Sequence, residues 1–396
     1  MNSYSDITIH HHYSSSVQKK KYLLSHNGKY YEVSHAIIEL VEELQQYKEE
    51  ETAIVAYIQK KEGKYSPEQV RKVIEKFIVP ILHAVPKKQT FLYEKEVLSA
   101  EAIDQFSDLF RFLFHKVYMA VILAGMLVLN TWFFLTTHNL LLFNNKVNIY
   151  MATGLLVFML ASSFFHELGH ASACKYFGIQ HGGIGFGLYL NFPVLYTNVT
   201  EVWKLKRGQR CVVNLAGVYF QSYWLILLLV AFFVTGNDML RYLILIMNLG
   251  FAMTLNPFFK FDGYWIASDL LGVPNLRQRS LELFSYMWNR LKKRPIKQLP
   301  YLLQIRRLER YGLLVYSVVV NLFMGYYFLY IIPTFLYRFV QTFPDAVNEL
   351  ILYLSNQMIP PFALLRNIGM QLIFLGLIVY LIYKSIIPLL KRHGRK

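Results

Sequence analysis

The sequence predicts a polytopic α-helical membrane protein with about six transmembrane helices and a small N-terminal α+β domain of winged-helix-like type. Of the 396 residues, 55% are hydrophobic and only 17% are charged, and the mean hydropathy is +0.30. This profile is typical of chains with several membrane spans. Apolar runs long enough for a hydrocarbon core of ~30 Å begin after residue 115. The residues before them have the patterns of short strands and amphipathic helices.

The amino-terminal part divides into a tail and a small domain. Residues 1–20 are polar, and we expect a disordered tail there. Residues 21–85 have the pattern of a folded unit. Tyr22–Ser25 and Lys29–Val33 are typical of two strands, and the Asn27-Gly28 pair between them favours a tight hairpin turn.

Three amphipathic helices are expected to follow this hairpin. Ser34 is a favourable cap for the first, Glu51–Lys61 fits the second, and Ser66 precedes a proline at the first position of the third. Residues 86–114 are predicted to be a charged connector, and residues 115–390 the membrane domain.

Six apolar runs account for the membrane domain, and the charges beside them predict its orientation. Basic residues are concentrated between runs two and three, between runs four and five, and after the last run. By the positive-inside rule, both termini are then cytoplasmic. The runs are Val117–Thr137, Ile149–Ala171, Val212–Thr235, Tyr242–Phe258, Gly312–Tyr337 and Ile368–Pro388.

The strongly basic composition argues for a lipid partner. The formal net charge is +16, but many of the basic residues lie in short loops beside apolar runs, where topology and anionic lipids account for them. No basic recognition helix stands out, so we expect the bilayer as a partner and no nucleic acid. Two cysteines leave no room for a disulfide framework or a cysteine-rich metal site.

The second apolar run ends in the pentapeptide His166-Glu167-Leu168-Gly169-His170. Two histidines four residues apart lie on one helix face, about 6 Å apart along the axis. Both imidazoles can therefore bind one Zn²⁺, with Glu167 placed to act on water as a general base. Ionisable groups at membrane depth are costly, which favours a functional site. The alternative is a chance match in an ordinary helix.

A catalytic zinc needs a third protein ligand, and Asp262 is the candidate. It follows the fourth run, after Asn256 and a helix-ending Pro257, and precedes a glycine that allows a tight turn. Runs two and four cross the membrane in the same direction, so Asp262 and the two histidines are expected at the same, cytoplasmic end. The alternative is that Asp262 is a helix-capping or turn residue.

The segment between runs two and three is poor helix material. Gly182–Thr200 contains several glycines, a proline and residues that favour strands. Irregular backbone at membrane depth needs protein or a wet cavity beside it. We expect Gly185 and Gly187 to lie on a strand edge that pairs with an extended substrate. An ordinary cytoplasmic hairpin is the alternative.

Taken together, these motifs resemble the site-2 protease family of intramembrane zinc metalloproteases. The sequence is most similar to the bacterial peptide zinc metalloproteases that mature ribosomally synthesised peptides (RiPPs, including bacteriocins). The resemblance covers roughly residues 149–280, and Asn198 and Val218 depart from it. The strings that carry it are the HELGH pentapeptide, Tyr196–Trp203, Asn214–Gly217, Asn256–Tyr264, Ser268–Leu271 and Pro274–Ser280.

This resemblance implies an intramembrane zinc endopeptidase in the bacterial cytoplasmic (inner) membrane. His166, His170 and Asp262 would hold the zinc, and Glu167 would act as general base. Asn256 would donate a hydrogen bond to the substrate backbone or the oxyanion; the alternative is that an asparagine before a proline simply ends the helix. The amino-terminal domain is similar to the leader-peptide recognition domains of peptide-maturation pathways. A short precursor peptide is therefore the expected substrate.

Two other functions stay open at this point. The first is a regulatory protease that cleaves a membrane-anchored signalling protein by the same chemistry. The second is a non-hydrolytic membrane protein for peptide export or immunity that has kept the scaffold. The complete set of zinc ligands and the retained glutamate argue against the second.

Overall fold

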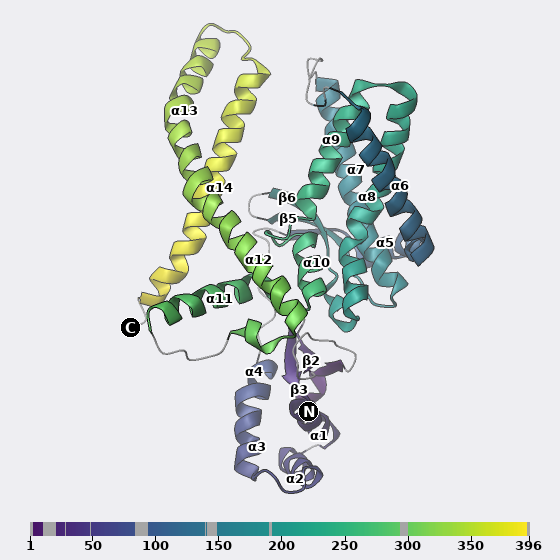
Figure 1. Cartoon of the computed structure of the whole chain (residues 1–396), viewed down its shortest axis with the longest axis vertical. Helices are drawn as coiled ribbons and strands as arrows, with labels where there is room; N and C mark the ends of the chain where they lie inside the picture. Colours follow the sequence, from purple (N-terminus) through teal and green to yellow (C-terminus); the bar gives the residue numbers. More distant parts are fainter. Residues whose placement is uncertain are drawn as a thin grey trace. The chain divides into compact units, whose positions relative to one another are not determined.

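The computed structural model describes residues 3–10, 21–27, 29–47, 49–83, 94–138, 140, 149–189, 192–293 and 300–393. Figure 1 shows the helices and strands in sequence order. The chain divides into two compact units, which are taken separately below. Unit 1 comprises Met1–Thr90, Glu94–Gly187 and Val194–Leu313, and unit 2 comprises Phe91–Tyr93, Leu188–Pro193 and Leu314–Lys396.

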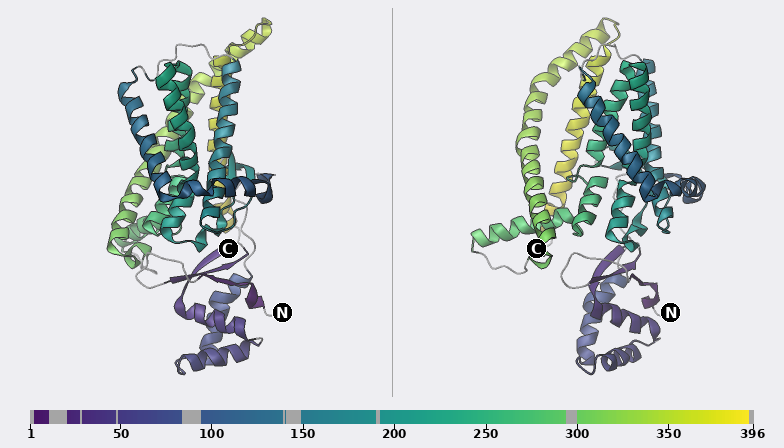
Figure 2. Two further views of the ribbon diagram at one scale, coloured as in Figure 1. Left: turned by 90° about the vertical axis from the view of Figure 1, so that its right-hand side faces the viewer. Right: turned by 45° about the vertical axis from the view of Figure 1, so that its right-hand side comes forward.

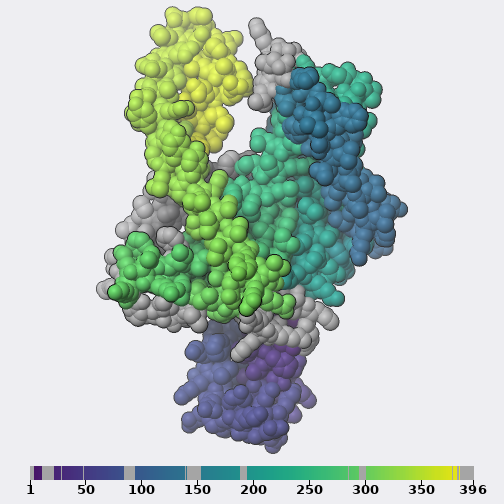
Figure 3. Space-filling view, viewed as in Figure 1, coloured from purple at the N-terminus to yellow at the C-terminus, as the bar shows by residue number. Residues whose placement is uncertain are grey.

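The amino-terminal domain combines a three-stranded antiparallel sheet with helices, so the predicted two-stranded hairpin has a third strand beside it. Its strands are β1 (Thr8–His10), β2 (Lys21–His26) and β3 (Lys29–Ser34), in the order β1-β2-β3. The domain forms a lobe of its own, coloured purple to violet-blue in Figure 3. The prediction of a disordered tail is wrong for Ser3–His10, because Ile7 is buried and β1 pairs with β2. Residues 11–20 lie outside the described part of the chain.

The helices of this domain close over one apolar core. They are α1 (His35–Gln46), α2 (Glu50–Lys60), and α3 (Pro67–Val73), which continues through a π-helical turn (Ile74–Ile78) into α4 (Val79–Leu82). Ser66 and Gln69 form a capping box at the start of α3. The fully buried core side chains include Leu24, Ile38, Val41, Leu44, Ile54, Ile74 and Ile78.

The described part of the predicted connector, residues 94–114, is structured, and residues 86–93 lie outside the described part of the chain. It contains β4 (Glu94–Leu98), α5 (Ala100–Phe110) and a 3₁₀ turn (Arg111–Phe114). Strand β4 pairs antiparallel with β5 (Ile184–Tyr189), which continues into β6 (Phe192–Thr197). The strand was not predicted because its partner lies about 90 residues away along the chain, a distance beyond any local pattern.

Helix α8 (Arg207–Thr235) is the centre of the helical part of unit 1. It packs against α6 (Lys116–Thr136), α7 (Ile149–Tyr176), α9 (Asp238–Thr254) and α10 (Asp262–Leu271). Figure 2 shows α6 to α9 running roughly side by side. The interior side chains of α8, such as Tyr219, Phe220 and Leu225, are fully buried. Helix α8 is therefore the scaffold on which residues of α7 and α10 meet.

Four helices of the described chain are long and apolar enough to cross a membrane: Lys116–Thr136, Arg207–Thr235, Arg307–Ser355 and Phe362–Tyr380. The predicted count of about six is therefore not confirmed. Helix α7 is not among the four, and the ionisable pentapeptide lies in its second half. Helix α9 has only 17 residues, about 26 Å of helix, which is short for a ~30 Å core.

Unit 2 is an antiparallel helical pair. A continuous helical stretch, Arg307–Ser355, begins in unit 1 as α12 (Arg307–Tyr326) and continues as α13 (Ile332–Ser355), and α14 (Phe362–His393) packs against α13. The ring centres of Phe335 on α13 and Phe374 on α14 lie 4.3 Å apart. The predicted runs at 312–337 and 368–388 lie within these helices, which extend beyond the runs.

Candidate metal centre

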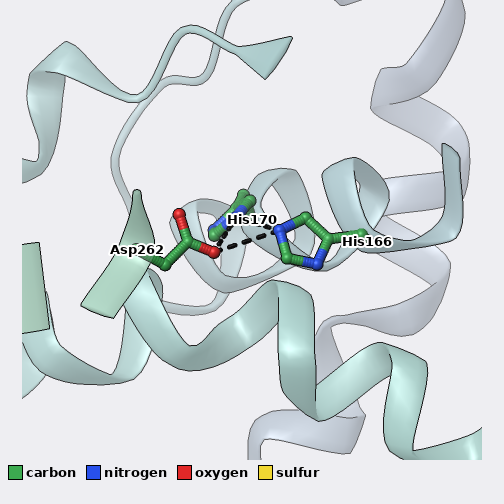
Figure 4. A group of neighbouring side chains, drawn as sticks. All are labelled: His166, His170 and Asp262. Atoms are coloured by element: carbon green, nitrogen blue, oxygen red, sulfur yellow. Dashed lines mark hydrogen bonds and ion pairs between the residues drawn. The ribbon is translucent and has the colours of Figure 1, made fainter. Parts of the chain in front are cut away.

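The three predicted metal ligands come together in unit 1. His166 and His170 lie on consecutive turns of α7, and Asp262 is the first residue of α10. Figure 4 shows the two imidazoles and the carboxylate converging on one point. The His166 Nε2 atom lies 3.2 Å from His170 Nε2 and 3.0 Å from Asp262 Oδ2, and His170 Nε2 lies 3.3 Å from the same oxygen.

The proton positions follow from what the other ring nitrogens contact. His170 Nδ1 lies 2.8 Å from the carbonyl oxygen of Val213, which only accepts, so Nδ1 donates. His166 Nδ1 lies 3.0 Å from Gln221 Oε1, and the Gln221 amide nitrogen donates to Ser162 Oγ at 2.8 Å. In neutral imidazoles these bonds leave both Nε2 lone pairs facing the Asp262 carboxylate.

These atoms fit a zinc ion. A tetrahedral zinc with bonds of about 2.0–2.1 Å places its ligand atoms about 3.3 Å apart, close to the three distances observed. The buried Asp262 Oδ2 has no hydrogen-bond partner among the described residues. Three electron-pair donors held this close repel one another unless a cation lies between them, so the donor set suits a metal with nitrogen and oxygen ligands.

Helix α8 fits closely under the histidines. A Cβ atom on Gly217 would lie 2.3 Å from the His166 ring, so only glycine allows the ring to reach its position. Together with Val213 and Gln221, Gly217 makes α8 the element that orients both imidazoles. Gln221 and Ser162 were not predicted from the sequence, since an amide and a hydroxyl are common in membrane helices and the spacing of the two residues carries no signal.

We expect Gln221→Leu to weaken zinc binding about 10–100-fold, which is the usual cost of losing a residue that hydrogen-bonds to a metal-bound histidine. Helix α8 and its packing should persist, because leucine fits a half-buried position in an apolar helix. Competition with a chromophoric chelator measures the affinity. Gln221→Glu, which keeps an acceptor for His166 Nδ1, is the matched control. Equal affinities for Gln221→Leu and the wild type would contradict the assigned role.

Asp262 is held in place by an ion pair between α8 and α10. Asp269, two turns along α10, accepts from Arg210 Nε at 2.6 Å and from the Asn214 amide at 2.8 Å. All three side chains are buried. Arg207 adds hydrogen bonds to the carbonyl oxygens of Asp269 and Leu270. These contacts fix α10 against α8 and thereby position its first residue beside the histidines.

Replacing Asp269 by alanine should destabilise the protein by about 3–5 kcal/mol, because the Arg210 guanidinium would remain buried without its partner. The control is Asp108→Ala, which removes an exposed ion pair with Arg111 at the end of α5 and should cost about 1 kcal/mol or less. Thermal unfolding in detergent compares the two. Similar melting temperatures for the two variants would contradict the account.

Glu167 lies beside the ligands on α7. It is 7% exposed, and its backbone carbonyl accepts from Thr197 Oγ1 at the end of β6, at 3.2 Å. A buried carboxylate next to a metal site suits a general base. The contact also brings the last residue of β6 beside the turn of α7 that carries His166 and His170.

The other predicted site residues have local structural roles. The Asn256 side-chain oxygen accepts a hydrogen bond from Phe258 N–H at 2.8 Å and closes the turn after α9. This contact agrees with the alternative interpretation, in which Asn256 ends the helix. In the sheet order β4-β5-β6, β5 is the central strand, and β4 pairs with it at Gly185 and Gly187. Their predicted exposure on a strand edge is therefore wrong. Gly185 instead accommodates the ring of Tyr196.

Comparison with known proteins gives one partial similarity. No protein-family model and no solved structure matches the chain. A Bacillus subtilis (strain 168) protein named "Putative peptide zinc metalloprotease protein YydH" is 29% identical over 122 residues. The match covers 30% of this chain and 48% of that relative, about half its length. The similarity supports a zinc metalloprotease-like relation, and the His/His/Asp group agrees with it.

Proposed function

We propose that the chain is an intramembrane zinc endopeptidase of the site-2 protease type, with α7 and α9 as further membrane spans and both termini on the cytoplasmic side of a bacterial inner membrane. The observation that carries the proposal is the convergence of two imidazole nitrogens and one carboxylate oxygen within 3.3 Å of one another. A buried glutamate lies beside them, on the same helix as the two histidines. Charged groups in such a helix are expensive without a function.

Each residue of the site has a role in hydrolysis. His166, His170 and Asp262 would hold zinc, which when bound supplies Lewis acidity that activates water and polarises a carbonyl. Glu167 takes a proton from the attacking water and delivers it to the leaving amine. The Asn256 amide nitrogen is the group that would donate to the substrate, since the side-chain oxygen is engaged with Phe258 N–H.

The outer strand β6 supports an extended substrate beside this site. Because β5 is the central strand, a peptide can join this sheet only at an outer strand, β4 or β6, and we place it at β6. The Thr197 contact places the end of β6 next to Glu167. Addition of a strand exposes a peptide backbone in extended form, which a protease requires for cleavage.

The substrate we propose is a short ribosomally synthesised precursor peptide. The amino-terminal sheet ends in the outer strand β3, and a leader that adds to β3 would be retained while the rest of the precursor enters the membrane domain. A membrane-anchored signalling protein is the alternative substrate. A non-hydrolytic export or immunity protein would use the same fold without cleavage.

Capture of the substrate tests this proposal. The Glu167→Gln variant and the wild type are crosslinked in native membranes, and bound peptides are identified by mass spectrometry. A short precursor held by the variant and cut only by the wild type is the expected result. A captured single-span regulator would replace the proposed substrate. No species cut by the wild type would overturn the hydrolytic function.

A further inference from the structure

Helix α11 (Leu276–Leu291) has one strongly apolar face. The first apolar residue, Leu276, is fully buried and anchors the helix to unit 1. Farther along, four large side chains are left exposed: Leu281 at 55%, Met287 at 56%, Trp288 at 48% and Leu291 at 77%. At helical spacing these residues fall on one broad face, so the helix ends with an apolar surface open to its surroundings.

The same helix is basic. Between Leu276 and Lys293 the chain has five basic residues and one acidic residue, Glu282. Glu282 is paired with Arg279 at 2.7 Å, which leaves the exposed Arg290, Lys292 and Lys293 to dominate the carboxyl end. The Lys292 ammonium lies 4.4 Å from the centre of the Trp288 ring. Aromatic and basic side chains of this kind gather where acyl chains meet headgroups.

The direction of α11 fits such a boundary. It lies across the direction of α7 and α8, as the views in Figures 1 and 2 show. It follows α10, which packs on the membrane-spanning α8, and it precedes the candidate span that begins at Arg307. A helix that connects two membrane-associated segments, with an apolar face and a basic end, has the form of an interfacial helix.

We propose that α11 is an interfacial helix that binds anionic phospholipids of the surrounding bilayer. Leu281, Met287 and Leu291 enter the acyl boundary, while Arg290, Lys292 and Lys293 contact headgroup phosphates. The proposal depends on the membrane location of the chain and is independent of peptide hydrolysis. Each basic residue near an anionic surface strengthens binding about fivefold, so lipid charge should control the depth of the helix.

Spin labels on the two faces of α11 test this in the full-length chain. Labels are attached at Leu291→Cys and, as the matched control on the polar face, at Ser285→Cys, after replacing Cys174 and Cys211. The protein is placed in nanodiscs of phosphatidylcholine with or without phosphatidylglycerol. Power saturation with oxygen and with a water-soluble nickel chelate reports the depth of each label.

With phosphatidylglycerol, the label at position 291 should be reached by oxygen and protected from nickel, and the label at 285 the reverse. The label at position 291 should become accessible to the nickel chelate in phosphatidylcholine alone. The same result is expected when the three basic residues are replaced together, as Arg290→Glu, Lys292→Glu and Lys293→Glu. A label at 291 that stays in water in every lipid would overturn the proposal. Burial at position 291 that is the same with and without phosphatidylglycerol would overturn the headgroup contact.

Discussion

Glu167→Gln is expected to lower peptide hydrolysis by about 10²–10⁴-fold, the usual contribution of a positioned general base. Zinc content should stay at the wild-type level, because the amide replaces a carboxylate that is not one of the three ligands. The side chain is buried on α7, and glutamine has nearly the same shape. Turnover of the captured peptide, measured beside metal analysis of the same sample, gives both quantities.

The control for this variant is Glu101→Gln, at the exposed start of α5. It makes the same chemical change away from the metal centre and should leave both turnover and zinc content unchanged. Wild-type turnover in Glu167→Gln would remove the assigned base. Loss of zinc in this variant would instead make Glu167 a ligand.

Asp262→Ala is expected to reduce zinc affinity by more than about 100-fold, which exceeds the loss expected for Gln221→Leu, a residue that only hydrogen-bonds to a metal-binding histidine. The reason is geometric: Asp262 Oδ2 is the one carboxylate oxygen within 3.3 Å of both imidazole Nε2 atoms among the described residues. Activity should fall with the metal. Calorimetric titration of metal-free protein with zinc measures the change.

Asp238→Asn, at the start of α9, is the matched control for Asp262, since it alters another aspartate at a helix start. It should bind zinc as the wild type does. A folded Asp262→Ala variant with unchanged zinc affinity would contradict the ligand assignment. Circular dichroism and the melting temperature show whether that variant is folded.

The candidate metal centre was largely predictable because its parts follow local rules. The four-residue spacing of His166 and His170 places both rings on one helix face. Asp262 could be paired with them because the predicted topology brought two runs to the same end of the membrane. The structure supports that step, since the three ligand atoms converge.

The surrounding contacts were beyond prediction because they join distant residues. Gln221 meets His166 across 55 positions, and Asp269 meets Arg210 across 59, so neither pair leaves a periodic pattern. Strand β4 was missed for the same reason, and with it the pairing that buries Gly185. Asn256 shows the opposite case, because its contact with Phe258 is a two-residue turn that its type and position already suggested.

We propose that peptide cleavage requires zinc held by His166, His170 and Asp262. The direct measurement is cleavage of the captured peptide by purified protein in nanodiscs, before and after removal of the metal with a chelator. We predict that cleavage stops without metal, returns with one equivalent of zinc in the wild type, and does not return in Asp262→Ala. Cleavage that continues in metal-free protein would contradict the account.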